Sequence, residues 1–97
     1  MTVYVVAQLR FKDRAAYDRY QAAFAGVFRQ FEGRLLAADE SPQMLEGDRP
    51  CDKLVLMSFP DEQACRAWSD SEAYQRIAED RRAGADAVVM LVAGLGL

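Results

Sequence analysis

The sequence predicts an α+β domain of the ferredoxin-like type, with its elements in the order β-α-β-β-α-β. The apolar strand pattern of residues 54–59 leads into Pro60 and Asp61 and then into a helical pattern. The strand pattern of residues 3–11 leads in the same way into Asp13 and a helix. A further apolar segment follows each unit. Because right-handed crossovers place both helices on one side, we expect a four-stranded antiparallel sheet with two helices on one face.

The first strand alternates with a period of two residues, which places its side chains on two faces. One face carries Val3, Val5, Ala7, Leu9 and Phe11, and the other carries Tyr4, Val6, Gln8 and Arg10. Asp13 is expected to cap the following helix, because its carboxylate can accept hydrogen bonds from N–H groups of the first turn.

The first helix is predicted from apolar residues that recur three and four positions apart. They are Tyr17, Tyr20, Phe24, Val27, Phe28 and Phe31. Gly26 lowers the helix propensity of this segment, and we interpret it as a close approach of the helix to the sheet. Gly33 is expected to end the helix.

The second strand is predicted in two pieces, residues 34–38 and 43–46, with an edge or bulge at Pro42 because proline cannot donate to a strand ladder. Residues 47–50 predict a turn before the third strand.

The second helical region is expected to run to about Trp68, to break at residues 69–71 and to resume over residues 72–82. Gly84 is expected to end it, and residues 87–93 predict the last strand.

Several predicted strands are apolar on both faces, because residues 35–38, 54–57 and 88–92 do not alternate with polar residues. With both helices on one side, the second face of the sheet would lie bare in water. A large exposed apolar face is typical of an interaction surface. We therefore expect a homodimer whose two sheets face each other. The candidate residues of this dimer face are Tyr4, Val6 and Gln8.

Composition argues against several classes of function. The 97 residues fit a single domain, residues 1–97. Twelve basic and fifteen acidic residues give a net charge of −3 without a basic stripe, so we expect no nucleic-acid partner. The longest uncharged apolar run, residues 87–97, is shorter than the roughly 20 residues that span a bilayer, so we expect no membrane association. Cys51 and Cys65 form no pairing motif and predict free thiols in a cytoplasmic protein.

The chain contains no histidine. This removes the usual ligand of haem, zinc and non-haem iron, and also every Ser-His or Cys-His nucleophile pair. We therefore expect no metal site and no cofactor.

Three groups of residues together resemble a known family. They are Gly33-Arg34-Leu35, Leu45-Glu46-Gly47-Asp48, and Phe59-Pro60 followed by Ala64, Trp68, Ser71 and Tyr74-Gln75. The chain resembles domain-of-unknown-function family 1330 (DUF1330) over essentially its whole length. That family is similar in fold to the dimeric α+β barrels, which include small monooxygenases, muconolactone isomerases and stress-response proteins. The resemblance implies a homodimer with sheets packed face to face, and it implies no agreed activity.

One segment departs from the family pattern. Family members often carry a basic, glycine-containing segment after the Gly-Arg strand. In this chain residues 38–42 stand there, and they include the acidic residues Asp39 and Glu40. An anionic-ligand site built from that segment is therefore not expected here.

The candidate residues of a ligand pocket are Trp68, Tyr20, Tyr74 and Arg34. Trp68 offers a flat wall for an aromatic ligand, Tyr20 and Tyr74 offer phenolic donors, and Arg34 offers a bidentate grip on a carboxylate. The alternatives are core packing for the aromatic residues and a solvent-facing Arg34 paired with an acidic neighbour, Glu46 or Asp48.

Two functions remain open from the sequence. One is a small cytoplasmic homodimer that binds or converts a small organic metabolite without a cofactor, with Glu46 or Asp39 as a base if burial raises its pKa. The alternative is a non-catalytic module that binds a metabolite or only dimerises. The sequence does not decide whether the protein is an enzyme.

Overall fold

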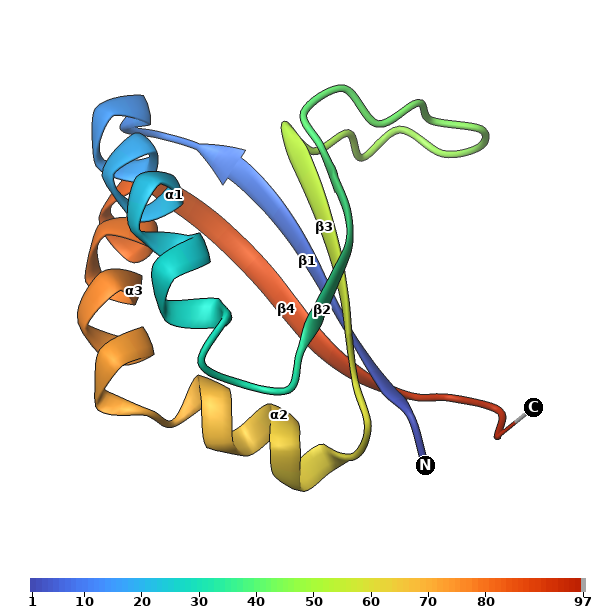
Figure 1. The fold of residues 1–97 in the computed structure, drawn as a ribbon. Coiled ribbons are helices and arrows are strands. Elements are labelled where there is room, and N and C mark those ends of the chain that lie inside the picture. The colour runs from blue at the N-terminus through green and yellow to red at the C-terminus, as the bar shows by residue number, and fades with distance from the viewer. Residues whose placement is uncertain (97) are drawn as a thin grey trace.

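The structure is a computed structural model that describes residues 1–96. Its elements are β1 (Val3–Phe11), α1 (Arg14–Phe28), β2 (Arg34–Asp39), β3 (Lys53–Phe59), α2 (Glu62–Ser69), α3 (Glu72–Gly84) and β4 (Ala85–Ala93). The four strands form one antiparallel sheet in the order β2-β3-β1-β4. Figure 1 shows α1 and α3 side by side over one face of this sheet, with α2 near one end. The predicted ferredoxin-like α+β fold is confirmed.

The strand register assigns each side chain to one of two faces, which we call the inner and the outer face. The inner face lies toward the helices and includes Val5, which pairs with Met57 of β3 and Leu91 of β4. The outer face includes Val6, which pairs with Leu56 and Met90. Because paired residues of antiparallel strands point to the same side, these pairs fix the facing of β1, β3 and β4. Leu35 of β2 pairs with Met57 and so lies on the inner face.

The helix starts follow the predicted capping residues. The Ala16 N–H donates to Asp13 Oδ1 (3.3 Å), and the Ala64 N–H donates to Asp61 Oδ1 (2.8 Å). Ser71 begins α3 by accepting from the Tyr74 N–H (3.1 Å), so the predicted break between α2 and α3 is confirmed. Each cap satisfies an N–H group that has no partner within its own helix.

The prediction of a second strand piece at residues 43–46 is wrong. β2 ends at Asp39, which pairs with Leu54 near the start of β3. Beyond this point the neighbouring strand offers no ladder to pair with, and residues 40–52 form a connection without a strand. The expected edge position is confirmed, because β2 is the first strand in the sheet order. The register shift of β2 lies between Leu35 and Ala37 and not at Pro42.

Two glycine interpretations also need correction. A Cβ on Gly26 would meet only the end of the Arg29 side chain, at 3.9 Å, so no close approach to the sheet explains this glycine. α1 ends at Phe28, ahead of Gly33. Gly33 serves packing, since a Cβ there would lie 2.5 Å from the Phe28 ring and 2.6 Å from the Phe59 ring. Both rings belong to the core.

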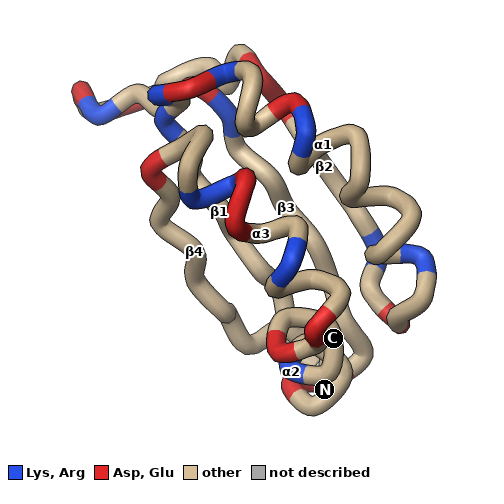
Figure 2. Tube along the Cα trace, turned by 90° about the vertical axis from the view of Figure 1, so that its left-hand side faces the viewer, with Lys and Arg blue, Asp and Glu red and all other residues tan. Residues whose placement is uncertain are grey.

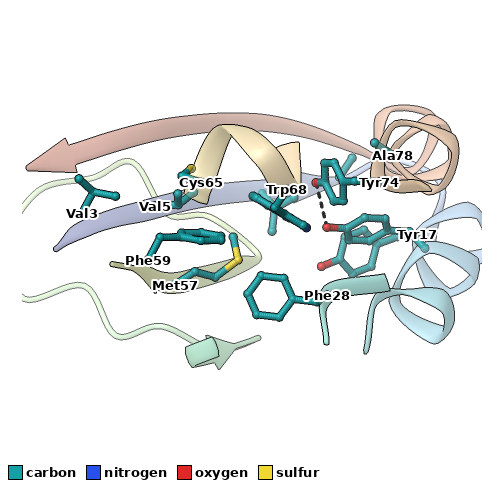
Figure 3. Close-up of a cluster of buried hydrophobic side chains, with 13 residues drawn as sticks. Val3, Val5, Tyr17, Phe28, Met57, Phe59, Cys65, Trp68, Tyr74 and Ala78 are labelled. Carbon is teal, nitrogen blue, oxygen red and sulfur yellow. Dashed lines mark hydrogen bonds between the residues drawn. The ribbon is translucent and has the colours of Figure 1, made fainter. Parts of the chain in front are cut away.

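Aromatic rings dominate the space between the helices and the inner face, as Figure 3 shows. Trp68 stacks on Phe59 with ring centroids 5.4 Å apart, and it contacts Phe28 edge-on at 5.5 Å. Tyr74 lies 4.3 Å from Trp68 on the side of α3. Contacts of this kind add stabilisation to the burial of apolar area. Through them Trp68, near the end of α2, packs against β3, α1 and α3 at once.

Candidate ligand cavity

A cavity of about 390 Å³ lies between the helices and the inner face of the sheet. Its floor comes from the strands and its walls from α1, α3 and the end of α2. The side chains that line it include Tyr17, Tyr20, Gln21, Phe24, Ala25, Glu40, Lys53, Trp68, Tyr74 and Arg81. This volume is within the range of sites that bind small molecules, about 300–1,000 Å³. The cavity is therefore the candidate functional site.

The apolar wall is built from rings that the core already holds in place. Trp68 is only 4% exposed and lines the cavity while packing on Phe59 behind it. Tyr20 and Tyr74 meet at the same wall, with their hydroxyl oxygens 3.1 Å apart in a buried hydrogen bond, the dashed line of Figure 3. Rings fixed on both sides form a preorganised surface, so a planar ligand could stack there without ordering flexible side chains.

Lys53 places a positive charge in this apolar site. Its side chain rises from the start of β3 onto the inner face, and the residue is 6% exposed. Nζ donates to Gln21 Oε1 at 2.7 Å and lies 3.8 Å from Glu40 Oε2 and 4.9 Å from the centre of the Tyr17 ring. Burial lowers the pKa of Lys53, while the nearby Glu40 carboxylate acts in the opposite direction.

Glu40 lies at the rim of the cavity and joins the end of β2 to α1. Its two carboxylate oxygens each accept a hydrogen bond from the Arg14 guanidinium at 2.9 Å. Arg14 also donates to Asp18 at 2.8 Å. The Arg14 hydrogen bonds hold the pKa of Glu40 below its ordinary value. Glu40 is thus an ionised carboxylate whose lone pairs are largely committed to Arg14.

Two further N–H groups of the cavity residues lack a partner. Trp68 Nε1 and Arg81 Nε are buried and make no hydrogen bond to any part of the chain that the structure describes. Buried donors are normally paired, and an unpaired one costs free energy. Both residues line the cavity. Both nitrogen atoms are covered by the surrounding side chains, so neither faces the open cavity.

The hydroxyl groups of Tyr17 and Tyr20 are neutral near pH 7. Burial raises the pKa of Tyr17 to about 12. Burial, with help from Tyr74, also raises the pKa of Tyr20 well above its ordinary value. Their hydroxyl groups can therefore donate hydrogen bonds, and neither serves as a base at neutral pH.

The structure brings three of the four predicted pocket residues together. Trp68, Tyr20 and Tyr74 all line the cavity. Arg34 does not, because its register with Ser58 places it on the outer face, in a separate groove with Thr2 and Tyr4.

The predicted acidic partners of Arg34, Glu46 and Asp48, make no ion pair with it within residues 1–96. Glu46 and Asp39, the two predicted bases, are exposed and do not line the cavity.

The sequence reasoning missed the polar residues of the cavity, namely Lys53, Gln21, Glu40 and Arg81. One signal was present for Lys53. It stands two residues before Val55 and four before Met57, so the period of a strand puts it on the inner face with them. In the sequence Glu40 stood out only as part of the acidic segment that departs from the family pattern. Its partner Arg14 lies 26 residues away, so no local pattern connects the two.

The outer face is a platform of mainly aliphatic side chains. The predicted dimer-face residues Tyr4, Val6 and Gln8 lie along its middle strand. Val88, Met90 and Val92 of β4 flank them and are 57%, 45% and 45% exposed. Leu54 and Leu56 of β3 flank the other side. Figure 2 shows the charges gathered on the helices and connections, with β4 uncharged after Asp86.

Two features are absent from residues 1–96. No helix among residues 1–96 is long and apolar enough to cross a membrane. The same residues contain no group of three or more Cys, Asp or Glu side chains placed to hold a metal ion.

The fold and its inner cavity define a small ferredoxin-like α+β protein. The family described as "Domain of unknown function (DUF1330)" matches residues 2–95, so the chain belongs to this family. The resemblance seen in the sequence is confirmed. No curated protein matches the chain.

Solved structures share the fold at low sequence identity. RPA0582 of Rhodopseudomonas palustris, a protein of unknown function, is 17% identical with a TM-score of 0.82, over 99% of this chain and 84% of that one. A dimeric ferredoxin-like protein of unknown function from Jannaschia sp. CCS1 is 18% identical with a TM-score of 0.76, over 97% and 100%.

SnoaB of Streptomyces nogalater, described as a cofactor-independent oxygenase, is 16% identical with a TM-score of 0.70, over 99% of this chain and 95% of that one. At these identities the likeness concerns the fold alone.

Proposed function

We propose that this protein binds a small, largely apolar organic molecule in the inner cavity, and that it does so as a homodimer joined through the outer face. The observation that carries the binding proposal is the cavity itself. It combines about 390 Å³ of space, a wall of fixed rings and the ammonium group of Lys53. An apolar site with a few convergent polar groups is the usual composition of a small-molecule site.

A titration with an uncharged aromatic probe tests this proposal. 2-Naphthamide, followed by isothermal titration calorimetry, should bind with one site per chain. Ala25→Phe should weaken binding at least tenfold, because Ala25 lines the cavity and a ring at this position occupies the ligand's space.

The matched control is Ala22→Phe, an equally exposed position of α1 that does not line the cavity. It should bind like the wild type. Equal weakening by both variants, or a wild type that binds neither this probe nor its carboxylate counterpart 2-naphthoate, would contradict the proposal.

Conversion of the ligand without a cofactor is a second candidate function. Lys53 favours it, because a buried ammonium group can stabilise negative charge that develops on a substrate oxygen. The likeness in fold to SnoaB, a cofactor-independent oxygenase, is consistent with it. Native mass spectrometry of freshly purified protein should detect a carried molecule. A change in its mass during aerobic incubation would favour conversion, and a constant mass would favour the non-catalytic alternative.

The homodimer proposal rests on the outer face. Its residues are mainly aliphatic, its centre at Val6 is flanked by Leu56 and Met90, and the chain has no other layer to cover it within residues 1–96. A second copy is the occupant that we propose, because a flat apolar face can pack on an identical one across a twofold axis. The similar protein from Jannaschia is described as dimeric. We also propose a cytoplasmic location, consistent with the free thiols of Cys51 and Cys65.

A further inference from the structure

We infer that the molecule bound in the cavity is an aromatic carboxylate, with its carboxylate oxygens at Lys53 and Arg81 and its ring against Phe24 and Trp68. This inference rests on the proposed binding function and names the class of ligand. It follows from the balance of donors and charges inside the cavity.

The two cationic side chains of the cavity, Lys53 and Arg81, act only as hydrogen-bond donors. Lys53 Nζ has three N–H groups and makes one hydrogen bond within the described chain, to Gln21; Glu40 lies at 3.8 Å, beyond hydrogen-bond distance. The Arg81 side chain also lines the cavity and forms no ion pair within residues 1–96. A ligand with acceptor oxygens satisfies such a set, whereas a ligand that offers only donors leaves it unpaired.

The charge of the lining favours an anion over a neutral acceptor. Two cationic side chains, Lys53 and Arg81, line the cavity together with one carboxylate, Glu40. Both oxygens of Glu40 already accept from Arg14, a third cation beside the cavity, and Arg14 also pairs with Asp18, so three cations face two carboxylates. The cavity therefore has a positive charge in excess although the chain as a whole carries −3. A carboxylate would balance this charge and would accept charge-assisted hydrogen bonds from Lys53.

The aromatic rings that line the cavity favour a planar, apolar part in the ligand. Tyr20, Phe24 and Trp68 present rings to the cavity, and Trp68 is held by Phe59 and Tyr74 on its other sides. Planar aromatic ligands gain from stacking and edge contacts with such rings. One end of the cavity thus suits an anion and the other suits an aromatic ring.

The test compares two probes of nearly the same shape by isothermal titration calorimetry: the anion 2-naphthoate and the neutral amide 2-naphthamide. Wild-type protein should bind the naphthoate at least tenfold more tightly. Lys53→Met should reduce this preference to below twofold, because the loss of the ammonium group weakens binding of the carboxylate more than binding of the amide. Arg81→Met should reduce the preference at least threefold, and it provides the test if Lys53→Met does not fold.

Lys12→Met is the matched control, since Lys12 is an exposed lysine paired with Asp86 on the surface. It makes the same change of charge and should leave the preference intact. Equal wild-type affinity for both probes would overturn the carboxylate assignment while the binding function stands. A preference that survives both Lys53→Met and Arg81→Met would overturn the assignment to these residues. Failure of both probes to bind the wild type would overturn the binding function itself.

Discussion

The two faces of the sheet carry different kinds of side chain, although they belong to the same four strands. The inner face combines aromatic contacts with a buried lysine and a cavity, as at Lys53 and Trp68. The outer face carries aliphatic residues such as Val6, Val88 and Met90, and the middle of this face has no charge. Burial of apolar area explains both faces as parts of packed layers. It does not explain why only one of them encloses a charge.

The difference separates a surface that only has to be covered from a surface that has to recognise something. A face that meets a second copy gains stability from aliphatic area alone. A charged group inside an apolar layer opposes folding through its desolvation, so its presence at Lys53 needs another reason. Recognition of a ligand is the reason that we propose. Substitutions on one face at a time can test this difference.

The largest effect is expected on the outer face. Val6→Asp places a carboxylate at the centre of the proposed dimer contact in both copies, and desolvating an ion costs several kcal/mol. Light scattering at micromolar concentration should show the dimer mass for the wild type and the monomer mass for the variant. Ala22→Asp, at an exposed position of α1, should remain dimeric. A wild-type monomer, or a dimeric Val6→Asp, would show that the outer face is not the interface.

The next largest effect is expected for Trp68→Ala on the inner face. Truncating a buried aromatic side chain costs about 3–5 kcal/mol, because transfer free energy and packing are both lost. The free energy of unfolding from urea titration should fall by this amount. Leu45→Ala, at a position that is 97% exposed, should leave it unchanged. If Trp68→Ala unfolds like the wild type, the aromatic cluster does not carry the fold.

A smaller effect is expected from acid at the rim of the cavity. The pKa of Glu40 is lowered in the folded state by Arg14, so the unfolded chain binds the proton more tightly. The stabilisation is complete above the unfolded pKa, near 4.5, and is lost as the pH falls through the lower folded value. Thermal midpoints of the wild type should therefore decline below pH 4.5 more steeply than those of Glu40→Gln. Parallel curves would show that the Arg14–Glu40 pair adds nothing to stability.

The smallest effect on stability is expected for Lys53→Met, and its sign is informative. Burial lowers the pKa of Lys53, so the charged form is held at a cost that methionine does not carry. The hydrogen-bond partner Gln21 is exposed and can turn to water. The thermal midpoint should equal or exceed that of the wild type at pH 7. A clear drop would assign Lys53 a structural role and remove the argument that it is kept for a ligand.

Local patterns were enough to predict most of the fold. The helix caps at Asp13, Asp61 and Ser71 depend on neighbours three residues away, and the strand facing of Val6 depends on a period of two. The extent of β2 was mispredicted because it depends on where β3 begins, and pairing across a connection is a property of the whole sheet.

The candidate site was predictable only in its apolar half. Trp68, Tyr20 and Tyr74 stand out as large aromatic residues at helical spacing. The charged half joins Arg14 of α1, Glu40 after β2 and Lys53 of β3, whose contacts span 26 residues and more of sequence. No local pattern brings these together, and Arg34 looked equally suitable until the sheet register placed it on the outer face.

The most direct test of the division between the two faces is a ¹⁵N–¹H correlation spectrum recorded during titration with 2-naphthoate. Trp68 is the single tryptophan, so its indole N–H gives one resonance that reports on the cavity. The indole N–H of Trp68 and the amide of Lys53 should shift with saturation, while the amides of Val6 and Met90 stay in place. Shifts at Val6 and Met90 with an unmoved Trp68 indole would place the ligand on the outer face and contradict the account.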